Sequence, residues 1–169
     1  MRESQQDEIF SEWLSQYRAL LFKVVRIYAF ETEDQNDLFQ EISLQVWRSI
    51  PRFRGDAAVS TWLYRIALNT AIKWVKKEKK HRKEHDNIDQ VSLVLQESSN
   101  ENEQIAWLYE QIARMHAADR SLCLLLLDGL SYRDMVEILG ISESNVAVKI
   151  HRMKKELIEK SEKIYQNGV

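Results

Sequence analysis

The stretch that decides the fold is SYRDMVEILGISESNVAVKIHRMKK, residues 131–155. Its apolar residues recur at helical spacing on both sides of Gly140, where a left-handed helix end is expected. Ser131, followed by Asp134 three residues later, predicts the capped start of the first helix, and Ser142 predicts the cap of the second. The segment therefore predicts a helix–turn–helix whose second helix can enter the major groove of duplex DNA. An ordinary helical hairpin is the alternative.

Each helix of this segment has a packing side. At about 100° per residue, the residues expected to pack inward are Tyr132, Met135, Val136 and Leu139 from the first helix and Val146, Ile150, Met153 and Leu157 from the second. The opposite side of the second helix, expected to face DNA, holds Ser144, Asn145, Val148, Lys149, His151, Arg152 and Lys155. Since Ala147 and Val148 offer only apolar contact, we expect weak duplex binding by this surface alone.

Upstream of this segment, helical periodicity recurs and strand-like alternation is absent from the sequence. Helices are expected over residues 4–28, 33–50, 59 or 60 to 79, 103–115 and 118–127. Pro51 is expected to end the second of them. The polar, acidic stretch of residues 81–103 is typical of a flexible linker. The sequence thus predicts an all-α chain of two small helical domains, residues 1–80 and 104–169, joined by that linker.

Charge is distributed in blocks along the 169 residues, although the formal net charge is only −2. Residues 31–41 hold five acids and no base, and residues 65–83 hold eight bases and one acid. Residues 84–104 then hold six acids without Lys or Arg. Such alternation indicates separate surfaces for separate partners, one of them a polyanion. Ordinary solvated faces are the alternative.

The helix that ends near residue 79 carries chemistry on the side away from its core. Aromatic, amide and basic groups gather there, which suits unpaired DNA, because rings stack on bases, amides read base edges and cations hold phosphates. Stacking contributes about 1–3 kcal/mol per base, comparable with the few kcal/mol needed to flip a base out. This side holds Thr61, Tyr64, Arg65, Leu68, Asn69 and Ile72, with Trp62 and Lys73 at its boundary. The alternative is that Trp62 and Tyr64 pack against a neighbouring helix.

Composition and motifs disfavour several classes of protein. The single Cys123 excludes an internal disulfide and fits a reducing cytoplasm. The sequence has no apolar run long enough to cross a bilayer, no apolar signal core, no Gly-rich phosphate loop and no nucleophile–base pair. His81 and His85, set among Lys and Glu, are typical of a solvated face and not of a metal site. We therefore expect a cytoplasmic protein without membrane insertion, catalytic residues, metal or cofactor.

Two groups of motifs resemble a known family. DLFQE (residues 37–41), WRSIPRFRGD (47–56) and STWLYRIALNTA (60–71) resemble region 2 of the extracytoplasmic-function (ECF) sigma factors of the sigma-70 family. LDGLSY (127–132) and the helix–turn–helix after it resemble region 4 of the same group. The resemblance implies a sigma factor that binds core RNA polymerase, recognises the −10 and −35 promoter elements and nucleates DNA melting, while catalysis belongs to the polymerase.

The resemblance also implies where the polymerase binds. The acidic second helix resembles the segment that grips the clamp helices of the largest polymerase subunit, and the second domain is expected to meet the flap region. The residues at the clamp-binding positions are Asp37, Leu38, Gln40, Glu41 and Trp47. The acidic linker is expected to thread near the active-site cleft and the RNA exit path.

Promoter contacts, duplex and single-stranded, are implied at the remaining motifs. The loop of residues 53–58 resembles the pocket that receives a flipped base of the −10 element, and the helix after it resembles the part that melts and reads that element. For −10 recognition and melting, the matching residues are Phe53, Arg54, Gly55, Asp56, Ser60, Thr61, Trp62, Tyr64, Arg65, Asn69, Lys73, Lys76 and Lys77. For the −35 element they are Ser142, Ser144, Asn145, Val148, Lys149, His151, Arg152 and Lys155.

The recognition helix departs from the family at Ala147, where arginine is frequent. We therefore hypothesise that promoter choice depends chiefly on the −10 contacts, or on another protein that delivers this factor to DNA. An anti-sigma factor or another DNA-targeting protein is a further expected partner. A stand-alone helix–turn–helix regulator is one rival to the sigma factor, but it would need firm duplex binding. A polymerase-binding adaptor whose DNA elements are vestigial is a second rival. Assembly with core polymerase followed by promoter-dependent transcription separates the three.

Overall fold

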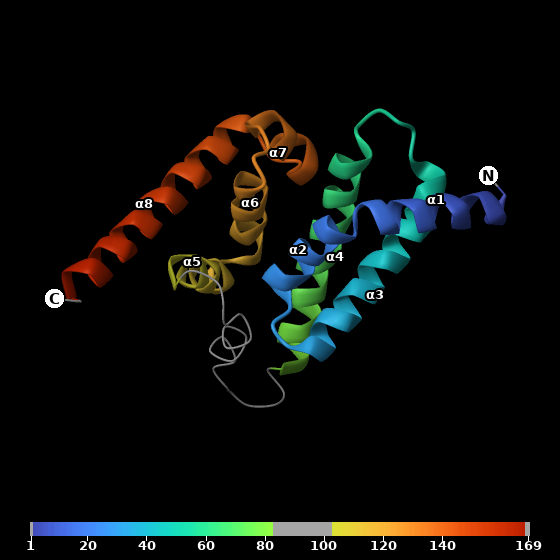
Figure 1. Ribbon diagram of the computed structural model, residues 1–169. Helices are drawn as coiled ribbons and strands as arrows, with labels where there is room; N and C mark the ends of the chain where they lie inside the picture. The colour runs from blue at the N-terminus through green and yellow to red at the C-terminus, as the bar shows by residue number, and fades with distance from the viewer. Residues whose placement is uncertain (1, 83–102, 168–169) are drawn as a thin grey trace.

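The computed structural model describes residues 2–82 and 103–167. Within them the chain forms eight α-helices and one short 3₁₀-helix, and no strand, so the all-α prediction is confirmed. Of the expected linker, residues 83–102 lie outside the described residues, as does His85. The two ends of the chain lie at opposite sides of the molecule, with the C-terminal helix extending away from the rest (Figure 1).

The first domain consists of α1 (Glu3–Gln16), α2 (Arg18–Tyr28), α3 (Thr32–Ser49), the 3₁₀-helix η1 (Ile50–Arg52) and α4 (Val59–Arg82). The single helix expected over residues 4–28 is broken at Tyr17, whose φ of −108° and ψ of 15° leave the helical region. Pro51 ends α3 as expected, since that helix stops at Ser49, and the proline itself fits the first turn of η1, where its missing N–H leaves no bond unmade. α4 packs on both α2 and α3.

The second domain consists of α5 (Glu103–Arg114), α6 (Ala117–Leu127), α7 (Tyr132–Leu139) and α8 (Glu143–Asn167). The expected caps are confirmed. Ser131 Oγ accepts the N–H of Asp134 at 3.1 Å while the Asp134 carboxylate accepts the N–H of Ser131 at 3.0 Å. The Ser131 hydroxyl also donates to the Asp134 carboxylate at 2.6 Å, and this bond, together with the one from the Ser131 N–H, lowers the pKa of Asp134. Gly140 is left-handed at φ 67°, and Ser142 Oγ accepts the N–H of Asn145.

The packing of the helix–turn–helix follows the prediction for α8 and departs from it for α7. Val146, Ile150 and Met153 are buried as expected, whereas Leu157, the fourth residue expected there, is half-buried. In α7 the buried residues are Met135 and Ile138, whereas Tyr132, Val136 and Leu139 are half-buried. The reason is that α7 lies between α8 and α4, so its inward side is turned toward two neighbours at once.

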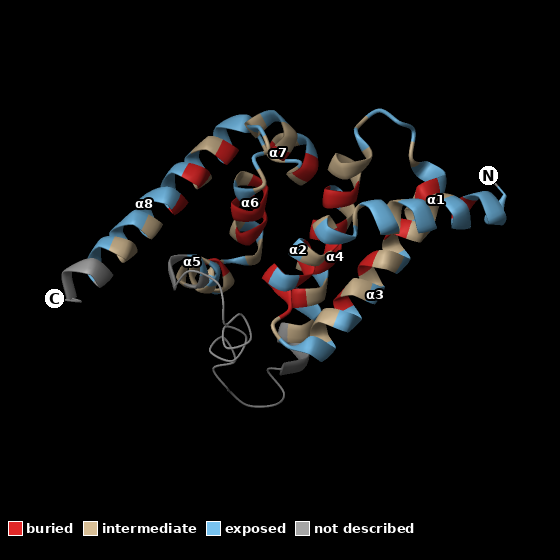
Figure 2. Cartoon of the chain, in the orientation of Figure 1, coloured by how far each residue is buried: buried red, intermediate tan, exposed pale blue. Residues whose placement is uncertain are grey.

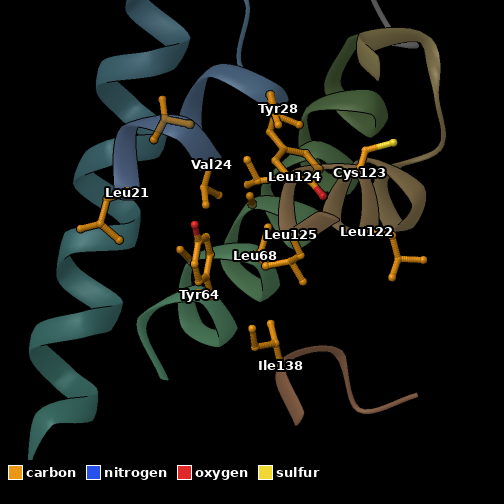
Figure 3. Close-up of a cluster of buried hydrophobic side chains, with 14 of the residues drawn as sticks. Leu21, Val24, Tyr28, Tyr64, Leu68, Leu122, Cys123, Leu124, Leu125 and Ile138 are labelled. Atoms are coloured by element: carbon orange, nitrogen blue, oxygen red, sulfur yellow. The ribbon is translucent and has the colours of Figure 1, made fainter. Parts of the chain in front are cut away.

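One hydrophobic core runs through both domains. Figure 2 shows buried positions on the facing sides of α2, α4, α6 and α7, and Figure 3 shows Tyr64 and Leu68 of α4 close to Leu125 and Ile138. All four of these side chains are at most 5% exposed. The second domain therefore packs directly on the helix that the sequence assigns to unpaired DNA.

In the described ranges, no helix is both long enough and apolar enough to cross a membrane. The same ranges hold no cluster of three or more His, Cys, Asp or Glu placed to bind a metal ion. Cys123 is a buried free thiol of the second domain, and burial raises its pKa to about 11.

Candidate nucleic-acid and polymerase-binding surfaces

The exposed side of α8 holds most of the residues expected at duplex DNA. These are Ser144, Asn145, Val148, His151, Arg152 and Lys155, all exposed. Ser142 Oγ is also exposed, but it is occupied by the helix cap and by a contact of 3.2 Å to Ser144 Oγ. Lys149 is half-buried, and its Nζ lies 2.9 Å from Asp119 Oδ1 of α6. One cation of the expected reading surface is therefore neutralised within the domain.

The acidic helix α3 presents part of the expected polymerase surface. Asp37 and Gln40 are exposed, and Glu41 is half-buried and accepts a hydrogen bond of 3.0 Å from Gln45. Leu38 is fully buried in the core, which corrects the expectation that it contacts the polymerase. Its place on the inward side of α3 follows from helical spacing with the buried Ile42. Leu38 supports the surface from beneath.

Trp47 lies where α1 crosses the end of α3. Its indole N–H donates to Asp7 Oδ1 at 2.8 Å, and its backbone oxygen accepts a bond of 2.7 Å from the side-chain amide of Gln6. Gln6 is itself buried. Gln6 and Asp7 were not among the residues predicted from the sequence. They fix the orientation of Trp47, which is expected to bind the clamp helices.

A surface groove runs along the line where α3 and α4 pack against each other. One hollow of about 250 Å³ is lined by Glu41 and Gln45 from α3 and, across from them, by Asn69, Lys73 and Lys77 from α4. A second, of about 350 Å³, extends it along the same two helices past Asp37, Gln40, Leu44 and Glu78. The acidic surface expected to bind polymerase and the basic, amide-bearing surface expected to bind DNA therefore adjoin across one groove.

The loop between η1 and α4 is anchored by three aromatic rings. The ring centroids of Phe53 and Trp62 are 5.1 Å apart, and Trp13 of α1 contacts both at 5.1 and 5.4 Å. All three are half-buried. Gly55, at the tip, has φ 77°, a backbone conformation that favours glycine. The remaining expected loop residues, Arg54 and Asp56, are exposed.

On the side of α4 expected to contact DNA, some residues are exposed or half-buried and others are buried in the structure. Arg65, Asn69, Lys73, Lys76 and Lys77 are exposed, and Ser60 and Thr61 are half-buried. Tyr64 and Leu68 are buried, at 5% and 1% exposure, which corrects the expectation that they face outward. The cause is the second domain, whose helices α6 and α7 both pack against α4.

A carboxylate of the second domain joins the two halves. Asp128, directly after α6, accepts the hydroxyl of Tyr64 through Oδ2, and the ammonium of Lys23 lies 2.6 Å from its Oδ1. Burial, followed by the bond to Asp128, raises the pKa of Tyr64 above its ordinary value. The phenol therefore remains a hydrogen-bond donor at neutral pH.

A second set of polar contacts lies at the other end of the same interface. The hydroxyl of Tyr28 is 2.5 Å from the backbone oxygen of Ala117 and 2.6 Å from Ser121 Oγ, and burial raises its pKa to about 12. The buried Arg120 donates to the backbone oxygens of Met115 and Ile27, at 2.9 and 3.4 Å. Its guanidinium also lies over the ring of Phe30. Burial lowers the pKa of Arg120.

These surfaces define a class of protein before any relative is considered: an all-helical DNA-binding transcription factor with a second, acidic docking surface. Comparison with known families is specific. Residues 13–81 match Sigma-70 region 2, and residues 105–157 match Sigma-70 region 4. The chain belongs to the ECF sigma factors of the sigma-70 family. It is an RNA polymerase sigma factor, whose domains bind core polymerase and promoter DNA to initiate transcription.

Curated relatives and solved structures agree with this assignment. The chain is 33% identical to the ECF RNA polymerase sigma-E factor of Haemophilus influenzae over 139 residues, which are 75% of this chain and 73% of the relative. It is 27% identical to the RNA polymerase sigma factor YlaC of Bacillus subtilis over 159 residues, 89% and 88% of the two chains.

Two solved structures share the fold. The sigma factor RpoE, in complex with the anti-sigma factor NepR from Bartonella quintana, aligns with a TM-score of 0.74 at 17% identity, covering 90% of this chain and 96% of that chain. CnrH, in complex with the cytosolic domain of CnrY, aligns with a TM-score of 0.66 at 18% identity, covering 95% and 94%.

Proposed function

We propose that the two sides of the α3–α4 groove divide the work of initiation. The acidic side, with Asp37, Gln40 and Glu41, binds the clamp helices of the polymerase. The opposite side, with Asn69, melts and reads the −10 element together with the exposed Arg65, which lies one turn earlier on α4. The observation that carries this proposal is their adjacency across one groove, because a factor seated on polymerase through α3 then presents α4 to the promoter at a fixed distance.

The remaining residues take supporting roles in this proposal. Lys73, Lys76 and Lys77 hold phosphates of the melted strand, and the loop of residues 53–58 receives a flipped base. The exposed side of α8 contacts the −35 element. With Ala147 and Val148 apolar and Lys149 paired to Asp119, this contact supplies little sequence discrimination, and the −10 contacts dominate promoter choice.

The proposed domain limits are residues 1–80 and 104–169, with residues 81–103 as the linker that threads the polymerase. The protein acts in the cytoplasm, and the chemistry of RNA synthesis belongs to the polymerase. Because the fold is shared with a sigma factor held by an anti-sigma factor, we propose that this chain is also controlled by such a partner or delivered to DNA by another protein.

Transcription with reconstituted holoenzyme tests the division of labour. Asn69→Ala removes an amide expected to read a base edge, so open-complex formation falls by about tenfold, a typical loss for one good base contact, while affinity for core polymerase stays within twofold. The combined Asp37→Arg and Glu41→Arg substitutions lower the affinity for core polymerase, because the reversed charge repels a basic partner surface. Open-complex formation by the holoenzyme that does assemble is then little changed. Glu12→Arg, an exposed change of the same kind on α1, is the matched control.

The outcome is read in two assays on the same proteins. Polymerase binding is measured by fluorescence anisotropy, and promoter opening by permanganate reactivity of unpaired thymines. If Asn69→Ala and the charge-reversal variant lose both activities in the same proportion, the two surfaces are not separate and the proposal is wrong. Firm duplex binding without polymerase association would instead indicate a stand-alone regulator.

A further inference from the structure

Helix α1 supports the end of α3, where the surface proposed to bind polymerase finishes. α1 crosses α3 at this end and contacts both α3 and η1 (Figure 1). Toward its C-terminus α1 is fixed by Trp13, which packs edge-on against the rings of Phe53 and Trp62. Near its N-terminus it is fixed by Gln6, a buried amide that donates to the backbone oxygen of Trp47 at 2.7 Å. α1 is therefore held at both ends and can orient a side chain that it contacts.

Trp47 lies in line with the exposed side of α3. Residues 37, 40, 44 and 47 follow one another at intervals of three or four positions, which places them on one side of an α-helix. Asp37, Gln40 and Leu44 are exposed and Trp47 is half-buried, so part of its ring is available to a partner. The surface proposed to bind the clamp helices therefore ends at a tryptophan, a residue type that often dominates the binding energy of protein interfaces.

The direction of this indole ring is set by one carboxylate of α1. Asp7 is exposed, and its Oδ1 accepts the indole N–H of Trp47 at 2.8 Å. The bond fixes the torsion angles of a side chain that would otherwise rotate among staggered positions. Both Asp7 and Gln6 lie before residues 13–81, the segment that matches Sigma-70 region 2, so the family match does not cover them.

We propose that Asp7 is a positioning residue for polymerase binding. It holds the indole of Trp47 in the orientation that contacts the polymerase, while Gln6 fixes the backbone of the same residue. An indole already held in its bound orientation loses less conformational entropy when the complex forms, so the affinity is higher. Asp7 acts through the tryptophan and not through its own charge. This inference rests on the proposed polymerase contact of α3, which the sequence predicts to include Trp47.

The test measures the affinity of full-length chains for core polymerase by fluorescence anisotropy. In Asp7→Ala the indole can rotate among about three positions, of which one is productive, so the affinity should fall about threefold. Asp7→Asn keeps an oxygen that accepts the bond and should recover most of the loss. Glu8→Ala is the matched control and should leave the affinity unchanged, because Glu8 is an exposed neighbouring acid that makes no ion pair within the described residues.

A double-mutant cycle separates this positioning from general support of the fold. Trp47→Phe keeps a ring and removes the N–H, so it should lower the affinity at least as far as Asp7→Ala does. Asp7→Ala added to Trp47→Phe should lower the affinity no further, because the bond is already absent. Thermal unfolding verifies that each variant is folded.

Three results overturn the positioning role of Asp7 and leave the polymerase contact of Trp47 in place. They are an equal loss from Asp7→Ala with and without Trp47→Phe, a loss in Asp7→Asn as large as in Asp7→Ala, and an unchanged affinity in Asp7→Ala when Trp47→Ala lowers it. Unchanged affinity in Trp47→Ala overturns the polymerase contact itself, and the positioning role with it. The failure of this inference and the failure of the contact on which it rests are therefore distinguishable.

Discussion

Lys149 of α8 donates to Asp119 of α6 across 2.9 Å, so the helix proposed to contact duplex DNA has one of its cations held by its own domain. Both side chains are partly exposed, at 35% and 26%. A pair of this kind contributes little to stability but changes how much positive charge reaches the phosphates. This pairing should therefore affect the affinity of the chain for duplex DNA and the salt dependence of that affinity.

Asp119→Asn should free Lys149 for the DNA backbone. Affinity of the full-length chain for a short duplex should rise by about two- to fivefold at low salt, and the slope of log affinity against log salt should steepen by about 0.9 for one added phosphate contact. Fluorescence anisotropy over a salt series measures both. Glu110→Gln, which removes an acid that pairs with Arg114 away from α8, is the control. An unchanged salt slope would contradict the prediction.

Trp13→Ala should lower the free energy of unfolding by about 2 kcal/mol. The change removes two edge-to-face ring contacts, each worth about 0.5–1.5 kcal/mol beyond burial, from a side chain that is half-buried. Urea denaturation followed by circular dichroism measures the loss. Trp13→Phe keeps an aromatic ring and should recover more than half of it. Equal losses in the two variants would show that the ring contacts are not responsible.

The turn of the helix–turn–helix should respond to changes at both ends of α7. Ser131→Ala removes the side-chain cap and should cost about 1 kcal/mol of stability. Gly140→Ala should cost about 1–2 kcal/mol, and entirely through the backbone, because an added Cβ would meet nothing within 4 Å. Thermal unfolding of the two variants and of Arg133→Ala, an exposed control in the same helix, checks this. A stable Gly140→Ala variant would contradict the left-handed cap.

The thiol of Cys123 should be nearly inert in the folded protein. Burial, with a smaller contribution from the charge of Asp119, raises its pKa from 9.0 to about 11. Since thiolate is the reactive form, alkylation at neutral pH should be about a hundredfold slower than in urea. A raised folded pKa stabilises the fold below pH 9.0, and this contribution is lost as pH rises to about 11. Cys123→Ser should flatten that part of the pH–stability curve.

The local features of the fold could be predicted from the sequence because they depend on neighbouring residues. The Ser131 and Ser142 caps, the left-handed Gly140 and the inward side of α8 all follow from spacing within one or two turns. The break at Tyr17 could not be predicted, since neither proline nor glycine marks it. Pro51 was expected to stop a helix, and α3 does end at Ser49; the short 3₁₀-helix that follows and holds the proline was not expected.

The burial of Tyr64 and Leu68 could not be predicted because it depends on a segment about sixty residues away. Periodicity identified the core side of α4. It did not decide whether the second apolar side, which holds Tyr64 and Leu68, faces DNA or packs on another helix. Leu68 and Ile72 on that side were a usable signal, because a helix that is apolar on two sides is covered on two sides. Leu38 is the simpler case: it matches the family's motif, yet helical spacing with Ile42 places it inside.

The continuous core that joins the two domains affects the solubility and lifetime of the chain when it is not bound to polymerase. Separation of the two domains would expose leucines of α4 and α6 together, and a contiguous apolar surface of this kind promotes aggregation and proteolysis. Packing of the two domains on each other keeps this surface buried. A variant whose domains no longer pack on each other should therefore aggregate more readily and be shorter-lived in the cell.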